Sequence, residues 1–216
     1  MGLAQNVGQS QVAGTSRIKT SMAKRQGKVR PSWENVKAEL ARFDRAALLA
    51  LLQDLYAAAA GNRAFLHARF GLGLDLLQPY KKIMDRWLWP DVFRGEEASV
   101  SKAKRAISDY RKASGDAEAV AELMVYYCER AAGFCRDVDY QDAAYLDALV
   151  RMFGQALRTT TDLSANSGTI RNRLLERLDC VLDVGHELGY GVGDDMDVLH
   201  AEFIPFPKRR ATDGNR

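Results

Sequence analysis

Apolar residues recur at helical spacing along nearly the whole stretch from Ser32 to Phe203. Trp33, Val36 and Leu40, for example, would lie on one stripe of a helix. No segment of about four to eight residues alternates apolar and polar side chains between hairpin turns, as a strand would. The pattern therefore predicts an all-α protein.

Capping residues, glycines and prolines divide this stretch into segments. The segments predict helices at residues 32–43, 44–60, 62–70, 75–87, 99–112, 116–135, 140–159, 169–188 and 194–203. Because the connections are short, neighbouring helices should run antiparallel. We expect stacked antiparallel helical hairpins or an irregular bundle of about eight or nine helices, without a fixed repeat.

Composition fits one globular domain at residues 32–203. The chain has 216 residues, of which 47% are hydrophobic and 27% are charged. No apolar stretch reaches the roughly 18 to 20 residues that span a bilayer, so no membrane partner is predicted. The cysteines, Cys128, Cys135 and Cys180, are odd in number and sit among apolar helical residues. They predict buried, reduced thiols and a cytoplasmic location.

Charge is distributed unevenly along the chain. Residues 1–31 carry six basic side chains and no acidic one, and they predict a disordered basic extension. Two alternatives remain for this segment: its first 21 residues are a leader, or the protein starts at Met22. Residues 204–216 predict a basic C-terminal tail, with a net charge of +3 over residues 208–216. Since the whole chain carries +3, the part between these ends is acidic.

A basic island interrupts the acidic part. Residues 78–112 hold nine basic side chains against five acidic ones. If their helices are neighbours, the cations would form a groove for phosphate or an acidic partner, with aromatic rings available for stacking. The candidate cations are Lys81, Lys82, Arg86, Lys102, Lys104, Arg105, Arg111 and Lys112, and the candidate aromatic contacts are Tyr80, Trp87 and Trp89. The alternative is a solvated face paired with acids of residues 113–207.

A second candidate is an acidic helix face near the C-terminus. Asp179, Asp183, His186 and Glu187 stand at spacings that project from one side of a helix. Such a set would suit a hard metal ion and metal-dependent hydrolysis, with acids of residues 194–200 close by. The alternative is a wet carboxylate face, because leucines and valines occupy much of the other side.

Two short motifs carry a family resemblance. They are Lys104-Arg105-Ala106-Ile107-Ser108-Asp109-Tyr110-Arg111-Lys112 and the later Leu188-Gly189-Tyr190-Gly191 with Asp195-Met196 and Leu199. With these, residues 32–203 resemble an uncharacterised family of bacterial all-helical proteins, known only as a domain of unknown function. The resemblance implies an all-helical fold and no activity, ligand or catalytic residue.

These observations favour a non-catalytic helical interaction protein, adaptor-like or scaffold-like, with a protein partner. The alternatives are a nucleic-acid-associated protein that uses residues 81–112 and a metal-dependent hydrolase that uses residues 179–200. The sequence indicates no catalytic residue and no cofactor. Self-association is a further possibility, because residues 78–112 carry +4 and residues 113–207 carry −10.

Overall fold

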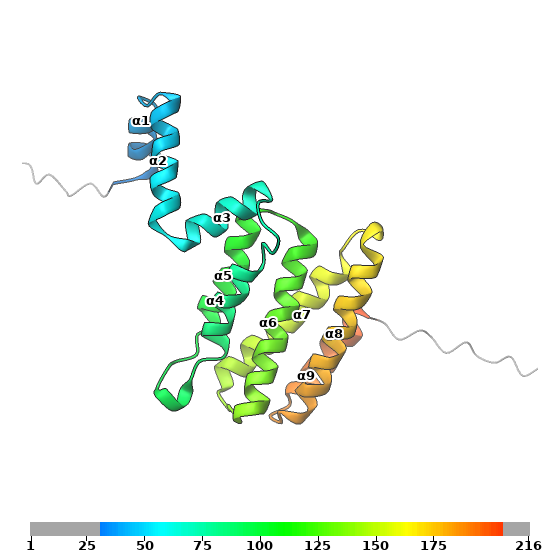
Figure 1. Ribbon diagram of the computed structural model, residues 1–216. Helices are drawn as coiled ribbons and strands as arrows, with labels where there is room; N and C mark the ends of the chain where they lie inside the picture. Colours follow the sequence, from blue (N-terminus) through cyan, green and yellow to red (C-terminus); the bar gives the residue numbers. More distant parts are fainter. Residues whose placement is uncertain (1–30, 205–216) are drawn as a thin grey trace, which may run out of the picture. The chain divides into compact units, whose positions relative to one another are not determined.

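The computed structural model describes residues 31–204, which form α-helices and two short 3-10 helices without any strand (Figure 1). This confirms the predicted all-α class. The predictions for residues 1–30 and 205–216 lie outside the described part of the chain. The elements are α1 (Trp33–Leu40), α2 (Arg45–Ala58), α3 (Ala60–Phe70), α4 (Gln78–Leu88), η1 (Val92–Arg94), α5 (Val100–Ala113), α6 (Ala117–Val138), α7 (Ala143–Thr161), η2 (Ala165–Ser167), α8 (Gly168–Glu187) and α9 (Val192–Phe203).

Aspartates cap several helices. Asp44 accepts a hydrogen bond from the backbone N–H of Ala47 at 2.7 Å, and Asp116 accepts from the N–H of Glu118 at 3.0 Å. Both caps are as predicted, because a short carboxylate can satisfy N–H groups that have no partner within the helix. The predicted start at residue 140 is wrong, since Asp142 caps α7 instead.

Other predicted boundaries are also wrong. The second helix ends at Ala58 rather than at residue 60, and the third begins at Ala60 rather than at Asn62. The first helix ends at Leu40 rather than at residue 43. The helix predicted from residue 75 begins at Gln78, because the Asp75 carboxylate accepts hydrogen bonds from the N–H groups of Leu77 and Gln78. The last helix begins at Val192, since Gly191 adopts φ 75° and serves as its N-cap.

Contacts divide the chain into two units, Met1–Leu48 and Leu49–Arg216, with the boundary inside α2. In the first unit, α1 contains no buried residue. The second unit holds the hydrophobic core. Whether residues 32–203 act as one domain stays a prediction.

The core of the second unit is built around α6. This helix packs against α4, α5, α7 and α8, and α9 packs against α7 and α8. In Figure 1, α6 accordingly lies among the other helices of this unit. The largest fully buried side chains include Tyr127 and Phe134 of α6 and Phe153 of α7. Tyr145 is also buried, and its hydroxyl donates to the backbone oxygen of Leu88 at 2.6 Å, which ties α7 to the end of α4.

Candidate binding surfaces

The predicted basic surface lies on α4 and α5, which pack against each other. Lys81, however, turns toward α6 and is largely buried, with its Nζ 3.0 Å from Glu122 Oε1. Arg105 and Lys112 each lie 3.8 Å from a carboxylate oxygen of Asp109 on their own helix. Lys82, Lys104 and Arg111 are exposed and form no ion pair with another described residue. The structure thus engages part of the basic island within the chain and leaves part of it open.

Two cations converge on one aromatic ring of this surface. The Nζ of Lys102 lies 3.7 Å from the ring centroid of Trp87, and the Arg86 guanidinium carbon lies 5.2 Å from it. Such contacts stabilise a cation over an indole. A base that stacked on Trp87 would therefore compete with these cations for the ring.

The other two predicted aromatic contacts differ from expectation. Tyr80 is buried, and its ring packs edge-on against Tyr110 with centroids 5.1 Å apart. The prediction that Tyr80 provides a surface contact is therefore wrong. Trp89 is half-buried, with the Arg130 guanidinium 4.2 Å from its ring centroid and its edge packed on Gly133. A binding role for the remaining basic residues stays a prediction.

An ion-pair network that the sequence analysis missed joins α4, α6 and α8. Arg177 of α8 donates to Glu129 through Nε and Nη2, both at 2.7 Å, and to Glu122 through Nη1 at 2.6 Å. Lys81 reaches the same Glu122 from α4. Only the spacing of acids on α6 and of Arg173 and Arg177 on α8 could have indicated this network, because its members come from distant parts of the sequence.

The acids of this network, Glu122 and Glu129, are paired with the basic side chains of Lys81 and Arg177. Burial alone would raise the pKa of Glu122, but the hydrogen bonds from Arg177 and Lys81 outweigh it and hold that pKa below its ordinary value. Hydrogen bonding to Glu129 raises the pKa of Arg177 despite its partial burial.

Beside the network runs an open groove of about 500 Å³, whose charged lining residues are Lys81, Asp116, Glu118, Glu122, Arg173 and Arg177. Equal numbers of both signs line it, so it favours neither an anion nor a cation.

The predicted metal ligands of α8 are not brought together. His200 of α9 lies 2.9 Å from Asp179, and His186 lies 3.4 Å from Asp197 of α9. Within residues 31–204, the one group of three ligand atoms close enough for an ion is His186, Asp194 and Asp197. All three residues are exposed, and neither Asp183 nor Glu187 belongs to the group. These contacts pair α8 with α9 through His–Asp interactions, and they do not form the expected four-residue set.

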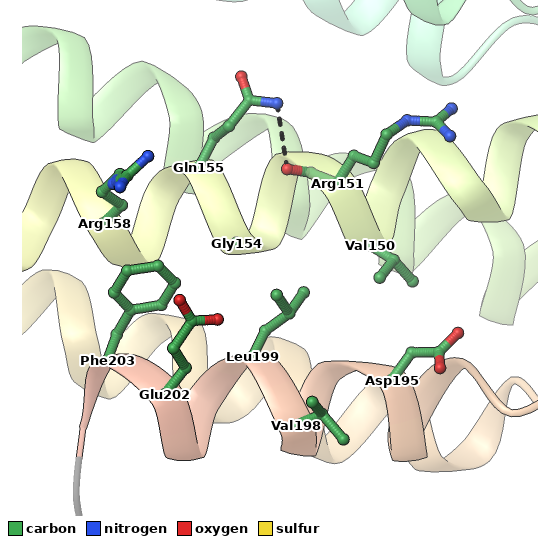
Figure 2. Close-up of a pocket in the computed structure, with 10 residues that line it drawn as sticks. All are labelled: Val150, Arg151, Gly154, Gln155, Arg158, Asp195, Val198, Leu199, Glu202 and Phe203. Atoms are coloured by element: carbon green, nitrogen blue, oxygen red, sulfur yellow. Dashed lines mark hydrogen bonds between the residues drawn. The ribbon is translucent and has the colours of Figure 1, made fainter.

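Between α7 and α9 runs an open groove of about 530 Å³ (Figure 2). Figure 2 shows Leu199 and Phe203 pointing from α9 toward α7, and Val150 pointing from α7 toward α9. The full lining is Val150, Arg151, Gly154, Gln155, Arg158, Asp195, Val198, Leu199, Glu202 and Phe203. The groove therefore combines an apolar floor with charged residues on its rim, which is typical of sites that take an apolar side chain from a peptide.

The helix α2 exposes apolar residues without any groove. None of its 14 residues is buried. Leu49 is 58% exposed, and Leu52 and Leu55 are each 47% exposed. The sequence analysis missed this surface, because a run of leucines and alanines in a helix ordinarily indicates a core element.

The cysteines differ in accessibility. Cys128 and Cys135 are buried in α6, as predicted, whereas Cys180 of α8 is exposed, so the prediction is wrong for that residue. Burial raises the pKa of the Cys135 thiol to about 12 and raises that of Cys128 as well. Thiols in that state are protonated at neutral pH and are poor nucleophiles.

Within residues 31–204, no helix combines the length and the apolar character that crossing a bilayer requires. Comparison of the chain with protein-family models, with curated proteins and with solved structures finds no match.

Proposed function

We propose that this chain is a non-catalytic helical interaction protein, adaptor-like or scaffold-like, that docks through the apolar surface of α2 onto a second copy of itself. The observation that carries the proposal is that α2, a helix of 14 residues, contains no buried residue. We place the protein in the cytoplasm, and its three free cysteines suit a reducing compartment.

The composition of α2 argues that something covers it. Arg45, Gln53 and Asp54 are its strongly polar residues, and leucine or alanine fills most other positions. A helix that is hydrophobic on nearly all sides is ordinarily buried. Three of its leucines expose about half of their surface, and burying each one fully would contribute roughly 1.5 to 3 kcal/mol.

The near absence of charge argues for a second copy. After Arg45, Asp54 is the single charged side chain of α2. A face without charge has nothing with which to select a strongly acidic or basic partner. An identical face complements it, since a two-fold interface brings the same apolar patch from each copy into contact.

The size of α2 sets the expected strength of this contact. A helix of 14 residues is about 21 Å long. Two such helices in contact bury on the order of 1,000 Å² in total, which is at the low end of specific interfaces. We therefore expect a reversible dimer with a dissociation constant in the micromolar range rather than a permanent one.

Sedimentation equilibrium of the full chain tests the proposal. The mass should rise with concentration toward twice the 24.0 kDa of one chain. Leu52→Lys and Leu49→Lys should each weaken the dimer at least tenfold, because a lysine would be buried at the contact. Phe93→Lys is the matched control, since Phe93 is 90% exposed on η1 and should leave the association unchanged.

A chain that stays monomeric up to roughly 0.1 mM, which corresponds to less than about 6 kcal/mol of association free energy, would contradict the proposal. So would a dimer that both lysine variants leave intact. Circular dichroism of each variant would show that the helical fold is retained.

A second candidate function is phosphate binding at α4 and α5, as in a nucleic-acid-associated protein. It is supported by the convergence of Arg86 and Lys102 at Trp87 and by the exposed Lys82 nearby in sequence. Electrophoretic shift of single-stranded and double-stranded DNA and RNA at moderate salt tests it. A shift that Lys102→Glu and Arg86→Glu both weaken would favour this function, and no shift by the unmodified chain would rule it out.

A further inference from the structure

The groove between α7 and α9 has an acidic side. The charged lining residues that α9 contributes are Asp195 and Glu202, and those that α7 contributes are Arg151 and Arg158. On the α7 side, Arg151 lies 3.6 Å from Asp147 of its own helix, so part of the opposing positive charge is engaged there. The floor would accept an apolar side chain of an occupant, and cations that follow this side chain would suit the α9 side of the groove rather than the α7 side.

The floor of the groove is set by close packing of the two helices. Leu199 lies against Gly154, where an added Cβ would come within 3.2 Å of the leucine Cδ1. The glycine leaves space for Leu199 to enter the α7 side. Next to this contact, Val198 is 70% exposed, so apolar surface remains uncovered along α9.

The chain itself continues from one end of this groove. Phe203 lines the groove, and the next residue, Ile204, leaves the helix with φ −124° and ψ 78°. The sequence then reads Pro205-Phe206-Pro207-Lys208-Arg209-Arg210. A proline at 205 prevents the helix from continuing. This segment places an aromatic residue first and three cations after it, so it can offer an apolar group to the floor and cations to the α9 side.

Residues 205–210 are also long enough to span the groove along α9. Along α9, the distance from Asp195 to Ile204 is about 14 Å at 1.5 Å per residue. Six residues in an extended conformation reach at most about 20 Å. A chain that turns back at residue 205 can therefore bring Phe206 to the apolar floor and a basic residue to Asp195 without strain.

We propose that residues 205–210 are an intramolecular ligand of the α7–α9 groove, with Phe206 as the apolar anchor and Lys208–Arg210 against the acidic side of α9. Any other segment of the same chemistry must then displace this one before it binds. The inference concerns a different surface from α2 and does not depend on the proposed dimer.

The test uses full-length protein and a fluorescent synthetic peptide that spans residues 204–216. In the Phe206→Asp variant the groove is vacated, and fluorescence anisotropy should show saturable binding of the peptide. The unmodified chain should bind it at least about tenfold more weakly, because its own segment competes at an effective concentration in the millimolar range. Adding Val198→Lys to the Phe206→Asp variant should remove the binding, because it places a charge at the apolar floor and repels the cations of the peptide, and adding Phe93→Lys should not.

Hydrogen exchange gives a second measurement on the same proteins. Amides of α7 and α9 that border the groove should exchange faster in the Phe206→Asp variant than in the unmodified chain. Equal peptide binding by the two proteins, or no binding to the Phe206→Asp variant at about 1 mM peptide, would overturn the inference. The sedimentation behaviour of the Phe206→Asp variant should match that of the unmodified chain, so the α2 proposal is judged separately.

Discussion

At the scale of single residues, burial decides what a side chain can do. Cys128 and Cys135 are enclosed in α6, and burial holds the pKa of both thiols above the ordinary range. Cys180 is the same residue type on α8 and is exposed. The sequence places all three among apolar residues, so their difference follows from which helix face meets the core.

We therefore expect one of the three cysteines to react rapidly with Ellman's reagent at about pH 8 in the native protein, because a thiol must ionise to react. All three should react after unfolding in denaturant. Cys180→Ser should remove the fast phase. Two or more fast thiols in the unmodified native chain would contradict the burial of Cys128 and Cys135.

Gly193 is another residue whose role depends on its neighbours. An added Cβ there would lie 2.8 Å from the Cα of His186, and the Cβ of a substituted Gly185 would lie 2.8 Å from the Met196 sulfur. These glycines allow α8 and α9 to approach closely. The backbone contact at His186 cannot yield without a shift of one helix.

Gly193→Ala should accordingly lower the free energy of unfolding by about 1 to 3 kcal/mol. Urea denaturation followed by circular dichroism measures this change. The matched control is Gly61→Ala in α3, where nothing lies within 4 Å of the added Cβ. We expect that substitution to be neutral or stabilising by up to about 1 kcal/mol, since alanine is the better helix former.

At the scale of elements, α4, α6 and α8 are joined by polar contacts as well as by the core. Glu122 of α6 accepts hydrogen bonds from Lys81 of α4 and from Arg177 of α8. The pKa of Glu122 is therefore lower in the folded chain than its ordinary value of 4.5. Its contribution to stability is fully present above pH 4.5 and is lost as the pH falls through the lower, folded-state pKa.

Glu122→Gln should lower the free energy of unfolding by about 1 to 3 kcal/mol at pH 7, since it weakens hydrogen bonds to a charged group. The difference from the unmodified chain should shrink as the pH falls below about 4.5. Chemical denaturation at a series of pH values would show this trend. Glu176→Gln, at an exposed position of the same protein, should change stability by less than about 0.5 kcal/mol at any pH.

At the scale of the whole molecule, charge separates the ends of the chain from its middle. Residues 1–31 carry +6 and residues 208–216 carry +3, although the whole chain carries only +3. The part between them is therefore left with −6. The sequence pI of 8.7 reflects the two ends rather than the helical part.

Removal of residues 1–31 and 208–216 should thus reverse the sign of the net charge at pH 7. The shortened chain should bind an anion exchanger at low salt, whereas the full chain should pass through. Passage of the shortened chain through the exchanger, or equal retention of the two chains, would contradict this distribution of charge.

The helical class and most helix positions follow from the sequence, because the 3.6-residue period and the capping residues Asp44 and Asp116 act locally. Several helix ends differ by a few residues, as at Asp142 and Gly191, where capping geometry decides between neighbouring candidates. Charge segregation is likewise a property of the sequence alone.

Only the tertiary structure decided which of those residues meet. It turned Lys81 toward Glu122, buried Tyr80, and set His186 against Asp197 instead of Asp183. It also left the leucines of α2 exposed and opened the groove between α7 and α9. The physical reason is that such contacts join side chains far apart in sequence, and their positions depend on how whole helices pack rather than on any local pattern.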